Sequence, residues 1–208
     1  MDEKIAKIKE WLGTGSINVF GLPYSGKDTV GLRLADLLGA KFLSSGLILR
    51  AAEKEDKDLA KDLAAGNLAP TETFKKIIMP YFSREDLKGA PLILSSVGRW
   101  EGEEIDIMNA AREGGHEIKA VVLLNISEDE AKARWDAAKV SGDRGERSDD
   151  REKKILDNRI NEFITKTMPV IETYRNEGLL IPVHAIGDRD EVFNAVIDEL
   201  VKFTEKTD

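Results

Sequence analysis

Short hydrophobic runs alternate with helically spaced hydrophobic residues along this 208-residue chain. Ile5, Ile8 and Leu12 recur every three or four positions, which predicts an amphipathic helix over residues 2–12. Short continuous apolar runs are typical of strands that are buried on both faces of a sheet. We expect five such strands, at residues 16–20, 40–43, 91–94, 118–124 and 179–183.

Helical patterns fill most of the chain between these strands. They cover residues 30–38, 46–75, 103–113, 127–139, 150–176 and 190–203. We expect breaks near Gly66 and Pro70, a bend near Pro169 and a frayed tail after Phe203. Strands that alternate with helices predict an α/β fold with a parallel sheet and helices on both faces. Its site is expected at the carboxyl ends of the strands.

The composition excludes several classes of function. A net charge of −8 argues against non-specific nucleic-acid binding, which needs a broad cationic face. The chain has no cysteine, so disulfides, thiol catalysis and cysteine-ligated zinc are impossible. Its apolar runs are too short for a signal sequence or a membrane span. We therefore expect a cytoplasmic, monomeric protein without nucleic-acid or membrane partners.

Residues 21–29 carry the strongest chemical signal, Gly-Leu-Pro-Tyr-Ser-Gly-Lys-Asp-Thr. They fit the phosphate-binding pattern G-x-x-x-x-G-K between a predicted strand and a predicted helix. Gly21 and Gly26 allow a tight turn whose N–H groups point inward, and the start of the helix favours an anion. An ordinary glycine turn between strand and helix is the alternative reading.

Two side chains of this loop suit ATP and Mg²⁺. Lys27 is spaced to reach the β- and γ-phosphates, and Thr29 supplies a hydroxyl where Mg²⁺ would be held. Asp28 stands between them and offers a carboxylate beside the metal position. We predict Thr29 and Asp28 as the residues nearest the metal, with ATP and Mg²⁺ bound together.

From this loop onward, over about residues 16–203, the chain resembles the adenylate kinase family of nucleoside monophosphate kinases. That family also has one residue between Lys and Thr, as at Lys27-Asp28-Thr29, although it usually has Gly there. The resemblance implies a single three-layer P-loop domain over residues 1–208. Its core would be residues 14–44, 90–139 and 150–205, with a monophosphate-binding insert at 45–85 and a short lid at 140–149.

The resemblance also implies two sets of binding residues. The ATP-binding set is Gly21, Ser25, Gly26, Lys27, Asp28, Thr29, Arg134 and Gly187. Arg134 follows the fourth strand, and Gly187 lies in the loop that borders the ATP adenine in the family. The monophosphate-binding set is Ser45, Gly46, Arg50, Leu68, Ala69, Gly98, Arg99 and Glu103.

The acceptor set rests on three short segments. Residues 44–50, Ser-Ser-Gly-Leu-Ile-Leu-Arg, resemble Ser-Thr-Gly-Asp followed by an arginine. Residues 66–70, Gly-Asn-Leu-Ala-Pro, resemble Gly-x-Leu-Val beside the base. Residues 95–99, Ser-Ser-Val-Gly-Arg, resemble Asp-Gly-Phe-Pro-Arg. The family acids are absent at Leu47 and Ser95, which leaves Asp28 as their candidate replacement.

Glu103 stands where the family has an adenine-reading glutamine. A carboxylate accepts hydrogen bonds and cannot donate one to adenine N1. It suits the adenine amino group, or the N1–H and amino group of guanine. The alternative is that Glu103 only begins a helix, where acidic residues are favoured.

Arginines around a predicted glycine loop complete the site. The resemblance implies that Arg134, Arg144, Arg147 and Arg159, together with Lys27 and Arg99, are catalytic. Either Arg144 or Arg147 would reach the transferring phosphoryl group from residues 141–150. Phosphoryl transfer needs such a cluster of charges, whereas an isolated charge run is commonly a solvated surface.

The predicted reaction transfers the ATP γ-phosphoryl group to a nucleoside monophosphate, with AMP as the favoured acceptor. Two alternatives remain. The first is a P-loop kinase for another acceptor, such as GMP, CMP, a deoxynucleotide or a nucleoside. The second is a nucleotide-binding regulator with weak catalysis, because the acids at Leu47 and Ser95 are missing.

Overall fold

The structure is a computed structural model that describes residues 1–141 and 152–207. Five parallel strands form one sheet in the order β2-β3-β1-β4-β5. The strands are β1 (Ser16–Gly21), β2 (Lys41–Ser44), β3 (Leu92–Ser95), β4 (Ile118–Asn125) and β5 (Leu180–His184). Every predicted strand is confirmed to within one residue at each end.

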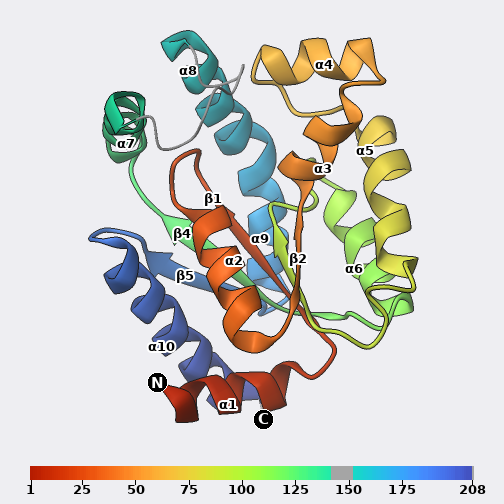
Figure 1. The fold of residues 1–208 in the computed structure, drawn as a ribbon, viewed down its shortest axis with the longest axis vertical. Helices are drawn as coiled ribbons and strands as arrows, with labels where there is room; N and C mark the ends of the chain where they lie inside the picture. Colours follow the sequence, from red (N-terminus) through yellow and green to blue (C-terminus); the bar gives the residue numbers. More distant parts are fainter. Residues whose placement is uncertain (142–151, 208) are drawn as a thin grey trace.

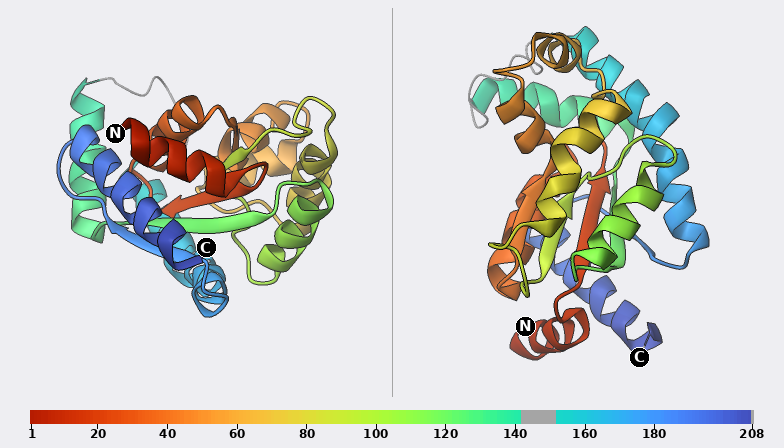
Figure 2. Two further views of the ribbon diagram at one scale, coloured as in Figure 1. Left: turned by 90° about the horizontal axis from the view of Figure 1, so that it is seen from below. Right: turned by 90° about the vertical axis from the view of Figure 1, so that its right-hand side faces the viewer.

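Helices cover both faces of the sheet, as the pattern predicted (Figure 1, Figure 2). On one face lie α1 (Asp2–Leu12), α2 (Lys27–Leu38) and α10 (Arg189–Thr207). On the other face lie α6 (Glu103–Glu113) and α9 (Met168–Asn176). Successive β1 side chains alternate between the two layers, because Val19 packs in one apolar cluster and Phe20 in the other.

The segment predicted as an insert forms three helices and a short 3₁₀ turn. These are α3 (Ser45–Ala52), α4 (Lys57–Ala64), α5 (Thr71–Ile78) and η1 (Met79–Ser83). The breaks near Gly66 and Pro70 are confirmed. A further break after Ala52 was not predicted. It arises because Asp56 accepts hydrogen bonds from the backbone N–H groups of Asp58 and Leu59, which starts α4.

The helical segment predicted over 150–176 is interrupted within its described part. It consists of α8 (Lys153–Glu162), a π-helical turn η3 (Phe163–Thr167) and α9. Pro169 is the second residue of α9 and has no N–H to donate to the preceding turn. The wider turn accommodates this loss, since the Met168 N–H bonds to the Phe163 carbonyl five residues back.

Two predicted boundaries were wrong. Helix α7 (Glu128–Ser141) includes the first two residues of the predicted lid, whose remaining residues lie outside the described chain. The tail does not fray after Phe203, because α10 continues to Thr207. Thr204 is fully buried, and Trp11 Nε1 donates to Thr207 Oγ1 at 3.1 Å. Helix α1 therefore holds the end of α10. None of the described helices is long and apolar enough to cross a membrane.

Candidate functional site

The glycine loop between β1 and α2 turns through unusual backbone conformations. Tyr24 has φ 66° and Gly26 has φ 89°. Gly21 approaches the loop so closely that an added Cβ would collide with Ser25 Oγ and lie 2.9 Å from the Leu124 carbonyl oxygen. A side chain at residue 21 would therefore force the loop open, which explains a glycine at this position.

The first turn of α2 places Asp28 beside the end of β3. Ser95 Oγ donates a hydrogen bond of 2.6 Å to Asp28 Oδ1. Lys27 Nζ lies 3.5 Å from the Leu22 carbonyl oxygen, and Thr29 is exposed. The carboxylate of Asp28 thus lies next to Ser95, the position at the end of β3 where the adenylate kinase family has an acid.

Two adjoining clefts open at the carboxyl ends of the central strands. The loop cleft encloses about 470 Å³ and is lined by Gly21, Pro23, Lys27, Asp28, Ser44, Ser45, Gly46, Arg50, Ser95, Ser96, Arg99 and Arg159. The insert cleft encloses about 710 Å³ and is lined by Ser45, Gly46, Leu49, Arg50, Glu53, Leu63, Gly66, Asn67, Leu68, Ala69, Phe74, Arg99, Trp100, Glu103 and Arg159. Both volumes include space that is open to solvent, so a ligand can enter either cleft from outside.

Five residues line both clefts, and three of them are arginines. Arg50, Arg99 and Arg159 come from α3, the loop after β3 and α8. Burial, followed by the positive charge of Arg159, lowers the pKa of Arg99 to about 10, whereas Glu162 and Glu103 oppose that change. Arg99 Nε has no hydrogen-bond partner among the described residues. The junction of the clefts is therefore a concentrated cationic site that suits anionic phosphate groups.

The loop that carries Arg99 is held by buried polar groups. Asn18, fully buried in β1, donates to the Val97 carbonyl oxygen at 2.8 Å and accepts from the Val97 N–H at 3.3 Å. Ser45 Oγ donates to the Ser96 carbonyl oxygen at 2.6 Å. These bonds fix the backbone immediately before Arg99, and they also use the hydroxyl that the resemblance assigned to the nucleotide.

Glu103 begins α6 and also faces the insert cleft, so its two predicted roles are compatible. Its Oε2 accepts from the backbone N–H groups of Arg99 at 2.8 Å and Trp100 at 3.1 Å. Its Oε1 is buried without a hydrogen-bond partner in the described chain. Burial raises the pKa of Glu103, and hydrogen bonds from the Arg99 and Trp100 N–H groups and from the Thr71 side chain oppose that rise. Because Oε1 is buried, a ligand could donate to it only if the lining of the cleft moved.

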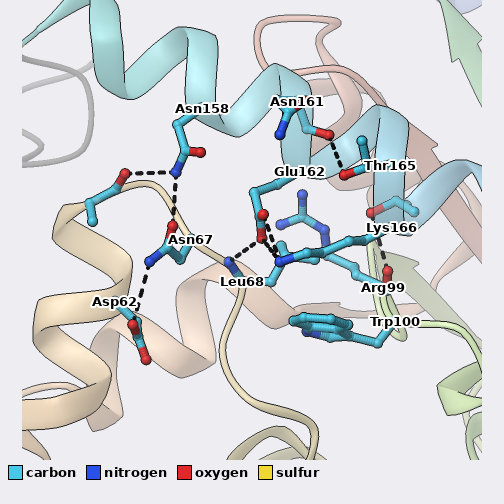
Figure 3. Close-up of polar contacts among 12 residues, drawn as sticks. Asp62, Asn67, Leu68, Arg99, Trp100, Asn158, Asn161, Glu162, Thr165 and Lys166 are labelled. Atoms are coloured by element: carbon cyan, nitrogen blue, oxygen red, sulfur yellow. Dashed lines mark hydrogen bonds and ion pairs between the residues drawn. The ribbon is translucent and has the colours of Figure 1, made fainter.

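Leu68 and Ala69 line the insert cleft, but their backbone groups have partners inside the protein. The Leu68 N–H donates to Glu162 Oε2 at 3.1 Å (Figure 3). Trp100 Nε1 donates to the Ala69 carbonyl oxygen at 2.9 Å. These two groups are thus not available to a base. Leu68 and Ala69 chiefly offer apolar contacts there.

The remaining predicted residues lie apart from the arginine junction. Arg134 Nη2 donates to the Ala185 carbonyl oxygen at 2.7 Å, and its Nε donates to Glu130 at 2.6 Å. The structure therefore brings Arg134 to the loop after β5 that contains Gly187. Arg144 and Arg147 lie outside the described residues.

Sequence reasoning missed several residues of this region. Asn18 was readable as a polar residue within an apolar strand, a position that requires hydrogen-bond partners. Trp100, Glu162 and Lys166 carried no comparable signal, because they meet only when α8 and η3 pack beside the insert. Their contacts are tertiary and join residues far apart in the chain.

Comparisons with known proteins agree with this geometry. A family model described as an AAA domain matches residues 20–156. An adenylate kinase of Mycobacterium sp. (strain MCS) is 32% identical over 190 residues, covering 88% of this chain and 98% of that protein. An adenylate kinase of Clavibacter michiganensis subsp. michiganensis (strain NCPPB 382) is 30% identical over 178 residues, covering 84% of this chain and 86% of that protein.

A solved structure shares the fold. A gluconokinase from Sinorhizobium meliloti 1021 superposes with a TM-score of 0.63 at 18% identity, covering 93% of this chain and 95% of that one. At that identity the likeness shows the fold alone. The two adenylate kinases cover 84% and 88% of this chain. The chain belongs to the adenylate kinase family of P-loop kinases and is a nucleotide kinase, an ATP-dependent phosphotransferase.

Proposed function

We propose that this protein transfers the γ-phosphoryl group of ATP to a nucleoside monophosphate, with AMP as the preferred acceptor. The observation that carries the proposal is the set of three arginines shared by the two clefts. A nucleoside acceptor has no phosphate and would not require this concentration of charge. The similar proteins are named adenylate kinase, which supports AMP in particular.

The proposal divides the site into a donor side and an acceptor side. On the donor side, Lys27 and the loop N–H groups would hold the ATP phosphates, and Arg134 and the Gly187 loop would border its adenine. On the acceptor side, Arg50 and Arg99 would hold the AMP phosphate. An oxygen of that phosphate attacks the γ-phosphorus while the bond to the β-phosphate oxygen breaks. Arg159, which lines both clefts, would stabilise the charge on the group in transit.

The donor side also fits Mg²⁺ bound with ATP. Asp28 and Ser95 bring oxygen atoms to the loop cleft, and Mg²⁺ prefers oxygen ligands while keeping several waters. When bound, the ion neutralises charge on the phosphates. The described residues contain no cluster of three acidic or histidine side chains that could hold a metal alone. ATP itself would therefore supply most of the ligands, with Asp28 and Thr29 nearby.

If movement of the cleft lining exposes it, Glu103 Oε1 would accept from a base that carries a hydrogen-bond donor. Adenine meets this requirement through its amino group, and guanine through its N1–H and amino group. Uracil offers a single N3–H. The preference for AMP over GMP consequently rests on the similar proteins rather than on Glu103 alone.

A panel of acceptors tests the proposal. AMP, GMP, CMP, UMP and their deoxy forms would each be assayed with ATP and Mg²⁺, with adenosine and guanosine as acceptors that lack phosphate. We expect turnover with AMP and none with the nucleosides. Faster turnover of GMP would change the acceptor, and turnover of nucleosides alone would overturn the proposal. Nucleotide binding without any turnover would indicate a regulator.

A further inference from the structure

A buried carboxylate at the end of helix α8 contacts residues beside the insert cleft. Glu162, the last residue of α8, is 6% exposed, which is unusual for a helical glutamate. Its Oε1 lies 2.6 Å from Lys166 Nζ, and its Oε2 accepts from the Leu68 N–H at 3.1 Å (Figure 3). Both carboxylate oxygens therefore have protein partners, as a buried charge requires.

The loop between α4 and α5 fits closely against α8 at this point. Asn158 Nδ2 donates to the Ala65 carbonyl oxygen at 3.0 Å and to Asn67 Oδ1 at 2.8 Å. At Gly66, φ is +80° and an added Cβ would lie 2.9 Å from the Ile155 carbonyl oxygen and 3.0 Å from Arg159 Cγ. The backbone of the insert thus touches the helix that carries Arg159.

The same part of the chain contacts the loop that carries Arg99. Lys166 Nζ lies 4.0 Å from the centre of the Trp100 ring, and Thr167 Oγ1 donates to the Arg99 carbonyl oxygen at 3.3 Å. Glu162 and Thr167 are five residues apart. Because the π turn between them bonds each residue to the fifth one along, both side chains lie on the same side of the helix.

The residues beside Glu162 form a wall of the insert cleft that is one residue layer thick. Asn67, Leu68 and Trp100 line that cleft and also line an open groove beside Lys166. One layer of residues therefore separates the two spaces. The Leu68 N–H bond to Glu162 and the Trp100 contact with Lys166 hold this layer in place.

We propose that Glu162 is a positioning residue of the acceptor site, holding the Leu68 wall against the helix that carries Arg159. This inference rests on the proposed function. The Glu162 side chain thereby fixes the position of Leu68, in the apolar wall of the insert cleft, relative to the three arginines at the junction of the clefts. Glu162 touches neither substrate in this role and acts through Leu68, Lys166 and the surrounding backbone.

Two variants at residue 162 and one control test the inference. Glu162→Ala removes the hydrogen bond to Leu68, whereas Glu162→Gln keeps an oxygen that can accept it. Glu172→Ala is the matched control, because Glu172 is an exposed carboxylate of α9 paired with Arg175 at 2.9 Å. The readouts are separate KM values for AMP and ATP and hydrogen exchange of residues 65–70.

For Glu162→Ala we expect an AMP KM about tenfold higher, the scale of one lost hydrogen bond to a charged group, with the ATP KM nearly unchanged. Exchange at residues 65–70 should accelerate. Glu162→Gln should recover most of both effects, and Glu172→Ala should show neither. If Glu162→Ala does not fold, a Glu162→Gln enzyme with wild-type KM values and exchange supports the hydrogen-bond role.

Unchanged exchange at residues 65–70 in folded Glu162→Ala, or equal rises of the AMP and ATP KM, would overturn the inference. So would a Glu162→Gln enzyme as impaired as Glu162→Ala, because the hydrogen bond would then not be the cause. A wild-type protein without turnover on any monophosphate refutes the proposed function instead. In that case, hydrogen exchange at residues 65–70 still tests whether Glu162 holds the loop that contains Leu68.

Discussion

The loop cleft and the insert cleft lie side by side, but they are built in different ways. The loop cleft contains one continuous segment, residues 21–28, whose glycines and helix start suit a phosphate group, and it takes its remaining lining from residues near 44–50, 95–99 and 159. The insert cleft takes its lining from four separate stretches, near residues 45–53, 63–74, 99–103 and 159. Local sequence therefore specifies the phosphate loop within the first cleft, whereas packing between distant elements completes that cleft and specifies the whole of the second.

This difference predicts where each cleft is vulnerable. A change within the phosphate loop should damage the chemistry directly, because the reactive groups are adjacent in the chain. A change on the acceptor side should mainly alter acceptor binding, since several elements share the task.

Lys27→Met should lower kcat by about 100-fold or more, because it removes a charge aimed at the phosphates during transfer. Steady-state rates at saturating ATP and AMP measure this. Lys202→Met is a suitable control, since Lys202 pairs with Glu199 on exposed α10. A loss smaller than about threefold would mean that Lys27 lies outside the active site.

Arg99→Lys should raise the AMP KM by about tenfold while changing the ATP KM much less. A lysine keeps the charge but loses the planar fork of donors that can bind phosphate through two hydrogen bonds. KM values for both substrates distinguish the two sides, with Arg112→Lys as the control, because Arg112 is an exposed arginine near the end of α6. Equal rises in both KM values would show that Arg99 does not belong to the acceptor side.

The AMP KM should also rise in alkaline solution. The pKa of Arg99 is lowered to about 10, so its charge is complete near pH 8 and half lost near pH 10. At pH 10.5 the loss of charge corresponds to an AMP KM about fourfold above its value at pH 8. A profile of KM against pH measures this, and in Arg99→Lys the rise should begin at lower pH, because a buried ammonium loses its proton more readily.

The contribution of Arg99 to folding stability depends on pH in a different way from its contribution to AMP binding. Its folded pKa lies below the ordinary value for an arginine, so between these two values the unfolded chain binds more protons than the folded chain. The contribution of Arg99 to the free energy of unfolding therefore increases with pH in that window. A melting temperature that falls together with AMP affinity near pH 10 would assign the effect to other groups.

Asp28→Asn should have the smallest effect. If Asp28 assists the metal through water, the Mg²⁺ concentration for half-maximal rate should rise about threefold, from a water-mediated contact of roughly 0.7 kcal/mol. The melting temperature should then change little. Asp36→Asn, on the exposed side of the same helix, is the control.

The opposite result identifies a different role for Asp28. A carboxylate at the start of a helix stabilises it by about 0.3–1 kcal/mol. An Asp28→Asn protein with an unchanged Mg²⁺ titration and a lower melting temperature would assign Asp28 to the helix alone. Ser95→Asp added to Asp28→Asn should restore the Mg²⁺ response only if the metal role holds.

The sequence by itself determined the phosphate loop and the five strands, because the physical causes are local. Apolar runs mark buried strands, and glycines followed by Lys27 mark a turn that binds phosphate. It also identified Arg50, Arg99 and Arg159, which the structure brings to one junction. Whether these arginines bind the acceptor phosphate stays a prediction.

Only the tertiary structure decided which distant groups meet. Ser95 donates a hydrogen bond to Asp28, which lies 67 residues away in the sequence, and Glu162 accepts one from the Leu68 N–H, which lies 94 residues away. The end of α10 stays helical because α1 lies against it, a contact with no local signal. Periodicity reports which face of an element is buried, but the partner on that face depends on sheet order and helix packing, which a single sequence does not encode locally.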